Sequence, residues 1–361
     1  MNKVYIQLIE KYFPGLLLRI MEEINGKSAD SPRTYYYRNY LKKVFSVDGR
    51  WETITANNTV MKADYVAVNS PLPLKQTGSL GTASGKIPKS GLEMQLNEEQ
   101  MDVIDTLIAL QRPQSLIAAK LLQHLPTVIL AVYELIESSF LEGLSNGLVA
   151  IADDRNVGTN VRLDFKYRTD HMFGVSKLWS DPTAKPFGDF KRAQDKANTE
   201  GKKITKWLLT ETDAYNIANT EQAKQLYAFT LGFVGSSIPT PTTEELNKMT
   251  KARFGYVFEI IDRTIVSQKN GVDTMYKPWA ENAVIGLCTN IVGELVWATV
   301  AEDRRRKDGV HYEKPEDFLL VAQFRENRPT LLEIVNSQAK VIPVISAIND
   351  IFKIDSSEIQ A

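Results

Sequence analysis

The spacing of hydrophobic residues predicts a long helical stretch in the first half of the chain. Apolar residues recur at helical spacing after Asn97, which together with Gln100 forms the capping pattern of a helix start. The same spacing resumes after Pro113 and continues to Gly147, a residue type that ends helices. Because proline removes a backbone donor, we expect bends or breaks at Pro113 and Pro126.

One face of this long helix is expected to be buried. We assign Leu135 to that face from the apolar spacing. A charge at this position should therefore damage the folded subunit, because burying a charge without a partner is costly.

Other patterns predict strands and shorter helices. Residues 148–154 and 161–168 form an antiparallel hairpin, since the second run alternates strictly between apolar and charged residues. From residue 187 the pattern becomes α/β, and the chain returns to strand patterns from residue 317. The predicted elements of this second half are a helix at 189–200, strands at 203–210 and 256–266, a helix at 212–229, a turn at Asn270 and Gly271, and strands at 284–290 and 294–303.

The first 50 residues show a weaker pattern. A short amphipathic helical repeat runs from Tyr5 to Phe13 and is followed by a polar segment and a run rich in tyrosine and basic residues. We interpret this stretch as an extended arm followed by a strand.

Composition and charge are those of a globular protein. A chain of 361 residues is expected to form two or three compact regions, and 43% hydrophobic with 24% charged residues is close to the soluble average. No uninterrupted apolar run is long enough for a membrane span, and the N-terminal stretch lacks a signal-peptide pattern. The net charge of −1 excludes a bulk attraction to nucleic acid. The single cysteine, Cys288, leaves no intrachain disulfide and is typical of synthesis in a reducing cytoplasm.

Residues 70–92 are rich in glycine, proline and lysine and do not show the pattern of a helix or a strand. It lacks the strand and helix that flank a dinucleotide-binding turn, and it lacks the Gly-Lys-Ser/Thr sequence of a phosphate loop. A long loop inside a compact domain is usually functional or disordered, and this one carries apolar residues that need burial. We therefore expect it to dock on a partner.

Residues with catalytic potential are scattered. The three histidines, His124, His171 and His311, lie far apart in the sequence, which favours structural roles over metal binding. Asp153 and Asp154 fall at a predicted turn. The basic run after Asp303 is interpreted as a solvated loop, with an interface or a DNA contact as the alternative. No nucleophile, metalloprotease or paired-carboxylate motif occurs, so we predict no catalytic, cofactor-binding or metal-ligating residues and no enzymatic activity.

Taken together, the order of these elements resembles the major capsid proteins of tailed phages, the Hong Kong 97-type fold, and specifically the lambda-type major head protein family. The matching segments cover most of the chain from about residue 60 onward. The most specific are SPLPLKQTGSLGTASGKIPKSG in the loop and WSDPTAKPFGDF before the predicted helix at 189–200. VRLDFKY and PTLLEIVNSQAKVIPVISAIN resemble later strands of the family.

The resemblance implies an α+β fold with an N-terminal arm, an extended loop, a long spine helix, a peripheral domain and an axial domain. On this division the arm is 1–50, the extended loop 51–96, the peripheral domain 97–184 with return strands at 319–361, and the axial domain 185–318. The loop would lie over a neighbouring subunit and bury its apolar residues there, at about 25 cal/mol per Å². The implied inter-subunit contacts are Pro71, Leu72, Pro73, Leu74, Lys75, Leu80, Lys86, Ile87, Pro88 and Lys89.

The implied function is a major capsid protein that assembles into hexamers and pentamers around phage double-stranded DNA, with no cofactor. The expected partners are further copies of the chain, portal and scaffold proteins, a decoration protein, and DNA held by weak non-specific contact. The expected location is the virion, after assembly in the host cytoplasm.

Three alternatives remain open. The first is the shell protein of an encapsulin-like nanocompartment, which would lack DNA and portal partners. The second is an α/β enzyme with its site in 185–318, which a pocket with convergent titratable groups and perturbed pKa values would support. The third is a tail or decoration protein, which would usually be smaller and lack the long helix.

Overall fold

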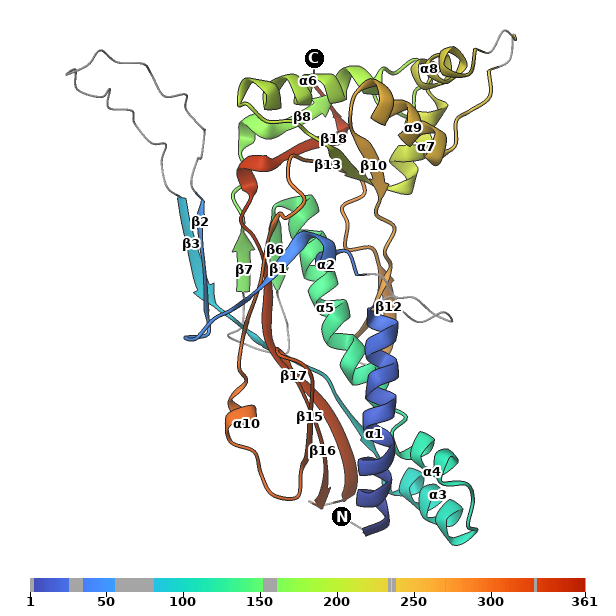
Figure 1. Ribbon diagram of the computed structural model, residues 1–361, viewed down its shortest axis with the longest axis vertical. Helices are drawn as coiled ribbons and strands as arrows, with labels where there is room; N and C mark the ends of the chain where they lie inside the picture. Colours follow the sequence, from blue (N-terminus) through green and yellow to red (C-terminus); the bar gives the residue numbers. More distant parts are fainter. Residues whose placement is uncertain are drawn as a thin grey trace, which may run out of the picture. The chain divides into compact units, whose positions relative to one another are not determined.

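The chain divides into two compact units in the computed structural model (Figure 1). The structure describes residues 3–25, 35–55, 81–151, 161–232, 235, 238–269, 271–327 and 330–360. The first unit comprises Met1–Trp51, Gly85–Ser139 and Glu294–Val344. The second unit comprises Glu52–Ser84, Phe140–Gly293 and Ile345–Ala361.

Helix α1 (Lys3–Ile24) is much longer than the sequence pattern predicts. Its 22 residues continue through Pro14, and Leu8, Phe13 and Ile20 are buried. The extended conformation predicted for the arm is therefore wrong for this part of the chain, because burial of one helix face outweighs the unfavourable proline. Further helices of the first unit are α2 (Tyr37–Tyr40), α3 (Glu98–Ala109), α4 (Gln114–Leu121) and α10 (Ala301–Arg304).

The predicted long helical stretch consists of α3, α4 and α5 (Leu125–Asn146). Asn97 and Gln100 form the predicted capping box, and Gly147 ends α5 with a positive φ of 73°. Pro113 immediately precedes α4, and Pro126 lies in the first turn of α5, so both predicted breaks are confirmed.

The assignment of Leu135 to the buried face of α5 is wrong. Leu135 is 44% exposed, whereas Leu141 is fully buried. The hydrophobic side chains of α5 surround most of the helix, so periodicity alone did not identify the exposed position.

A sheet of seven strands forms the centre of the first unit. Its main path is β1-β14-β17-β16-β15, and β4 and β5 also pair with β17. Strands β15 and β16, and β16 and β17, pair antiparallel. The strands are β1 (Leu41–Phe45), β4 (Lys89–Ser90), β5 (Glu93–Leu96), β14 (Gly293–Ala298), β15 (His311–Glu316), β16 (Leu319–Asn327) and β17 (Leu331–Ile345).

A buried carboxylate fixes the chain before β1. Glu137 on α5 is 0% exposed and accepts hydrogen bonds from the backbone N–H groups of Tyr36 (2.9 Å) and Tyr37 (3.1 Å). These are N–H groups at the start of the short helix α2, which lack partners within the helix. These hydrogen bonds hold the start of α2 against α5, which lies about a hundred residues later in the sequence.

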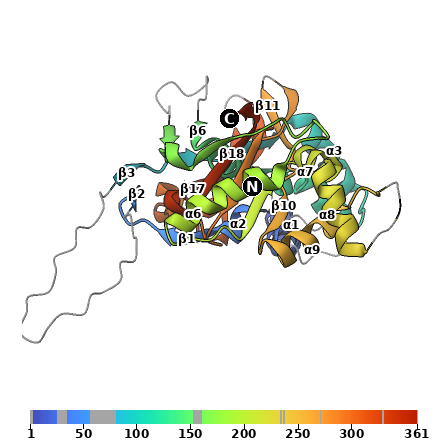
Figure 2. The same ribbon diagram turned by 90° about the horizontal axis from the view of Figure 1, so that it is seen from above.

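A five-stranded sheet of order β10-β9-β13-β18-β8 organises the second unit. Helices α7, α8 and α9 lie side by side near β10 in Figures 1 and 2. Trp207, Phe190 and Phe352 are completely buried in the core between sheet and helices. The elements are β8 (Met172–Val175), α6 (Pro186–Thr199), β9 (Lys206–Leu209), α7 (Glu211–Asn219), α8 (Glu221–Leu231), α9 (Thr243–Arg253), β10 (Val257–Ile260), β13 (Ala283–Leu287) and β18 (Ile351–Ile359).

Two predicted elements of this unit are divided in the structure. The single helix expected at 212–229 is two helices, because Thr220 is extended and its side chain accepts from the N–H of Ala223 to cap α8. The strand expected at 256–266 is divided into β10 and β11 (Ile265–Lys269). Helix α9 was not predicted, although Thr242 and Glu245 carry a capping-box signal.

The predicted hairpin is present, and a second hairpin flanks the predicted turn at Gly271. Strands β6 (Leu148–Ile151) and β7 (Val161–Asp164) pair antiparallel, as do β11 and β12 (Val272–Tyr276). Gly271 has the positive φ of 77° that a tight turn requires, whereas Asn270, Asp153 and Asp154 lie outside the described residues. Short 3₁₀ helices occupy Thr169–His171 and Ile348–Asp350.

Candidate assembly loop and adjoining sites

The predicted loop is described at its two ends. Strands β2 (Arg50–Thr55) and β3 (Gly81–Lys86) pair with each other, while residues 56–80 lie outside the described part of the chain. After β3, the N–H of Ile87 donates to the carbonyl of Gly49 at 2.9 Å. The start of β2 and the end of β3 therefore lie next to each other.

The chain after the loop, residues 89–96, pairs with β17 and is called here the second limb of the loop. In the antiparallel register Ser90 lies opposite Ala339 and Glu93 lies opposite Asn336. Between these pairs the N–H of Ser337 donates to the carbonyl of Leu92 at 2.9 Å. This limb thus forms part of the sheet of its own subunit.

Gly91 allows this attachment. A Cβ atom at this position would lie 2.0 Å from the carbonyl oxygen of Ser337, which is far inside van der Waals contact. Gly91 therefore serves a close approach of two backbones.

The predicted contact residues fall into two groups. Lys86 and Lys89 are exposed, Pro88 is half-buried, and Ile87 is 5% exposed. The burial of Ile87 within its own chain leaves little of its side chain for a neighbouring subunit. The inter-subunit role of the set stays a prediction, and its remaining members lie outside the described residues: Pro71, Leu72, Pro73, Leu74, Lys75 and Leu80.

The WSDP segment leads into α6 and is held by a buried carboxylate. Asp189, 1% exposed, accepts from the Ser176 N–H (3.0 Å), the Trp179 indole Nε1–H (2.9 Å) and Arg192 Nη2 (3.0 Å). Two of its donors lie before the helix and one lies on it. Asp189 therefore fixes the direction in which the chain enters α6, a role that the sequence did not reveal.

Replacing Asp189 with Asn should destabilise the second unit by about 2–4 kcal/mol, because a buried charged partner of Arg192 is lost and an amide N–H₂ is placed among donors. Thermal unfolding of the purified protein measures the effect. Asp195→Asn on the same helix is the matched control, since its carboxylate is exposed and pairs with Lys191 at the surface. Equal stability of the two variants would contradict the organising role of Asp189.

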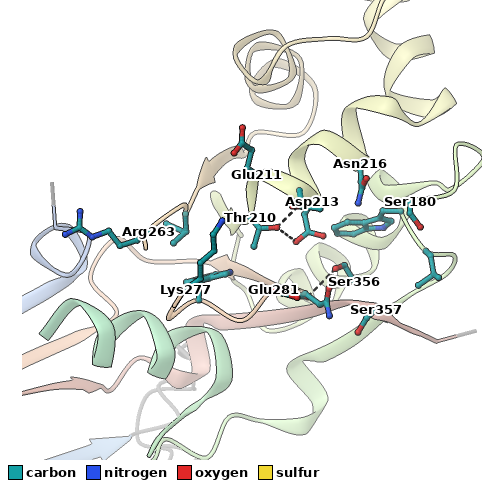
Figure 3. Close-up of a pocket in the computed structure, with 16 residues that line it drawn as sticks. Ser180, Thr210, Glu211, Asp213, Asn216, Arg263, Lys277, Glu281, Ser356 and Ser357 are labelled. Atoms are coloured by element: carbon teal, nitrogen blue, oxygen red, sulfur yellow. Dashed lines mark hydrogen bonds between the residues drawn. The ribbon is translucent and has the colours of Figure 1, made fainter. Parts of the chain in front are cut away.

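A pocket of about 460 Å³ lies beside this segment in the second unit (Figure 3). Asp213 in its wall is 4% exposed, and burial raises the pKa of its carboxyl group. Thr210 Oγ1 donates to Asp213 Oδ2 at 2.8 Å and caps α7, so this carboxyl group belongs to the start of that helix. The other charged lining residues are Glu211, Arg263, Lys277 and Glu281.

This pocket lies within residues 185–318 for the most part, where the enzyme alternative places its site. The pocket brings titratable groups together, as that alternative requires. The raised pKa of Asp213, however, is explained by burial of its carboxyl group at the start of α7. Lys277 pairs with Asp262 at 2.7 Å. The hydroxyl of Thr210 lies beside the carboxyl group of Asp213, but both groups cap α7. The enzyme alternative stays a prediction.

One group in the described residues has the spacing of metal ligands: Asp170, His171 and Glu200. Arg168 Nη2 lies 2.7 Å from Asp170 Oδ2 and 2.8 Å from Glu200 Oε1, and Lys196 Nζ lies 2.8 Å from Asp170 Oδ2. Protein cations thus already bind the carboxylate oxygens. The residues do not fit a divalent metal ion.

The remaining candidate residues have structural surroundings. His124 is half-buried, and desolvation lowers its pKa. Asp303 accepts from Arg306 and pairs with Lys314, and the hydrogen bond from Arg306 lowers the pKa of its carboxyl group. Burial raises the pKa of the Cys288 thiol to about 12, so this cysteine is a neutral thiol at physiological pH.

No single helix among the described residues has the length and apolar composition of a membrane span, although α4 and α5, bent by 41° at their junction, meet that test as a pair.

Comparisons with known proteins give structural matches only. No family model and no curated protein sequence matches the chain. A protein described as a prophage capsid protein of Escherichia coli CFT073 superposes with a TM-score of 0.57 at 12% identity, over 94% of this chain and 98% of that one. A phage-related protein of Bordetella bronchiseptica RB50 gives 0.52 at 15% identity, over 95% and 97%.

These superpositions show the fold. They extend over nearly the whole of both chains, so they include the helices and sheets of both units. The chain has the α+β fold of a phage capsid protein, and the predicted Hong Kong 97-type fold is confirmed.

Proposed function

We propose that this chain is the shell-forming subunit of a tailed-phage or prophage head, assembling into hexamers and pentamers that enclose double-stranded DNA. The observation that carries the proposal is the structural match to a prophage capsid protein over 94% of this chain and 98% of that one. The virion is then its final location, and the host cytoplasm the place of assembly.

The described surface supports assembly. Large apolar side chains are exposed on both units, among them Val47 (82%), Phe229 (79%) and Met275 (75%). Such side chains can be buried between subunits, where apolar surface removed from water contributes about 25 cal/mol per Å². A net charge of −1 also limits repulsion between the many copies in one shell.

Portal, scaffold and decoration proteins are proposed as partners on the same basis. DNA would contact the inner face of the shell only weakly, because the balanced charge of the chain provides no general attraction to phosphates.

Negative-stain electron microscopy of the purified protein tests the proposal. We expect closed shells, or rings of five and six subunits, and DNA within shells produced together with the neighbouring genes. A monodisperse monomer under every condition would contradict the proposal and direct a substrate screen to the pocket of Figure 3. Shells that enclose a protein cargo instead of DNA would favour the nanocompartment alternative.

A loop variant provides the matched test. Deleting Gln76–Ser84 is predicted to leave a folded subunit that does not form stable shells. Since residues 81–84 belong to β3, the sharper variant deletes only residues 76–80, which lie outside the described part of the chain. Circular dichroism should match the unaltered protein while microscopy shows no stable shells; heat-stable shells from the variant would contradict an inter-subunit role for the loop.

A further inference from the structure

Helices α1 and α4 of the first unit lie side by side and leave a groove between them (Figure 1). Two hollows, of about 460 and 330 Å³, line this groove and share Lys11 as a wall residue. The part of α1 that lines them extends from Val4 to Arg19, which is about 22 Å at 1.5 Å per helical residue. The groove is therefore long enough to receive three turns of a second helix.

The floor of the groove is apolar. Leu8 and Ile117 are buried in the lining of the first hollow, and Ala118 and Leu122 in the lining of the second. Gly15 also lines the second hollow, and nothing lies within 4 Å of a Cβ atom added to it. The second hollow thus offers apolar surface and free space to an incoming side chain.

The rim of the groove is basic. Its charged residues are Lys11, Arg19 and Arg112, and among the described residues no carboxylate lines either hollow. Lys11 Nζ donates to the neutral amide oxygen of Gln114 at 2.8 Å, and neither arginine pairs with a described carboxylate. Three cations above an apolar floor fit an amphipathic helix that carries acidic residues.

The outer face of α3 has the complementary pattern. Glu99, Asp102, Val103 and Leu110, the residue that follows the helix, are separated by three, four and seven positions and therefore share one side. Val103 is 52% and Leu110 61% exposed, and neither carboxylate pairs with a described cation. The helix sequence EEQMDVIDTLIA contains no basic residue. This face combines exposed apolar side chains with unneutralised negative charge.

We propose that the outer face of α3 from a second copy of the chain occupies the groove between α1 and α4. Its carboxylates then face the cations of the rim, and its two exposed apolar side chains are removed from water over the floor. The 12 residues of α3 are about 18 Å long, which the groove accommodates. The inference rests on the proposed function, which brings many copies together in one shell. Because each copy carries both surfaces, the contact can continue from copy to copy, as a ring requires.

Charge reversal on the two surfaces tests this contact. We expect Lys11→Glu with Arg112→Glu to weaken association of the full-length protein by about tenfold or more, and Glu99→Lys with Asp102→Lys to do the same, because like charges then face each other. The chain with all four substitutions should recover association to within about threefold of the unaltered protein. Sedimentation velocity over a dilution series, at about 50 mM salt where screening is weak, measures the effect.

The recovery separates a contact from damage to the subunit, since damage would accumulate in the chain with four substitutions. Weak association of that chain would overturn the inference. Unchanged association of either chain with two substitutions would overturn it as well.

Gly15→Leu tests the space in the groove. The leucine side chain fills the second hollow, and leucine favours a helix more than glycine does, so the subunit should lose no stability. We expect association to weaken by about tenfold while the thermal unfolding midpoint does not fall. Gly188→Leu in α6 is the matched control, because its added Cβ also meets nothing within 4 Å. Equal association of the two variants would overturn the inference.

Other occupants of the groove would give different results. A partner protein is the occupant if reversal of the rim charges abolishes assembly only with the neighbouring gene products and reversal on α3 has no effect. A DNA contact is present if reversal of the rim charges weakens binding of a DNA duplex and reversal on α3 leaves association unchanged. Either result overturns the inference and leaves the proposed shell function intact. Association that the four substitutions restore, in a protein that never forms shells, would contradict the proposed function alone.

Discussion

Leu141→Asp is expected to prevent accumulation of soluble, folded protein. Leu141 lies on α5 and is 0% exposed. An aspartate there places a charge in an apolar environment with no partner, which should cost about 4 kcal/mol or more, a large fraction of the stability of a typical domain. The fraction of protein in the soluble extract, followed by circular dichroism of whatever is soluble, measures the effect.

Leu135→Asp is the matched control on the same helix. Its side chain is 44% exposed, so the same substitution should change the stability of the subunit by less than about 1 kcal/mol. This expectation reverses the one drawn from periodicity. If Leu135→Asp also failed to fold, the exposed side of α5 would be misassigned.

Gly91→Ala is expected to detach the second limb of the loop from β17. The new methyl group would lie 2.0 Å from the carbonyl oxygen of Ser337, and a backbone atom cannot move aside as a flexible side chain can. Relief requires loss of the 2.9 Å hydrogen bond from Ser337 to Leu92 and of the neighbouring pairs of β4 and β5. The cost should be about 3 kcal/mol.

Hydrogen exchange locates this effect. We expect the amides of residues 89–96 to lose protection in Gly91→Ala, together with a lower unfolding temperature. Gly188→Ala is the control, because nothing lies within 4 Å of its added Cβ and the residue is inside α6. Alanine there should stabilise the helix by about 0.5–1 kcal/mol. Unchanged protection at 89–96 would mean that Gly91 is not required for the attachment.

Local signals predicted most helices, strands and turns. The capping box at Asn97, the terminating glycine at Gly147 and the alternation in β7 all act within a few residues, so each can be recognised without the rest of the chain. The resemblance of the loop and the WSDP segment to phage capsid proteins predicted the fold, which the structural comparison confirms.

Elements without a strong local signal were harder to predict. The continuation of α1 through Pro14 depends on burial of Leu8, Phe13 and Ile20. The division of 212–229 depends on the extended conformation of Thr220. In both cases the pattern was compatible with more than one length, and packing selected the observed one.

The sequence by itself determined the main helices and strands and the position of the loop, because these follow from hydrophobic spacing, caps and turn residues. Its resemblance to phage capsid proteins indicated the class of fold. Only the tertiary structure decided that Leu135 is exposed and that Asp189 and Glu137 hold distant backbone segments. Each of these features involves residues far apart in the sequence or depends on which face of a helix is buried. Burial and hydrogen-bond partners of this kind arise only when separate elements pack together.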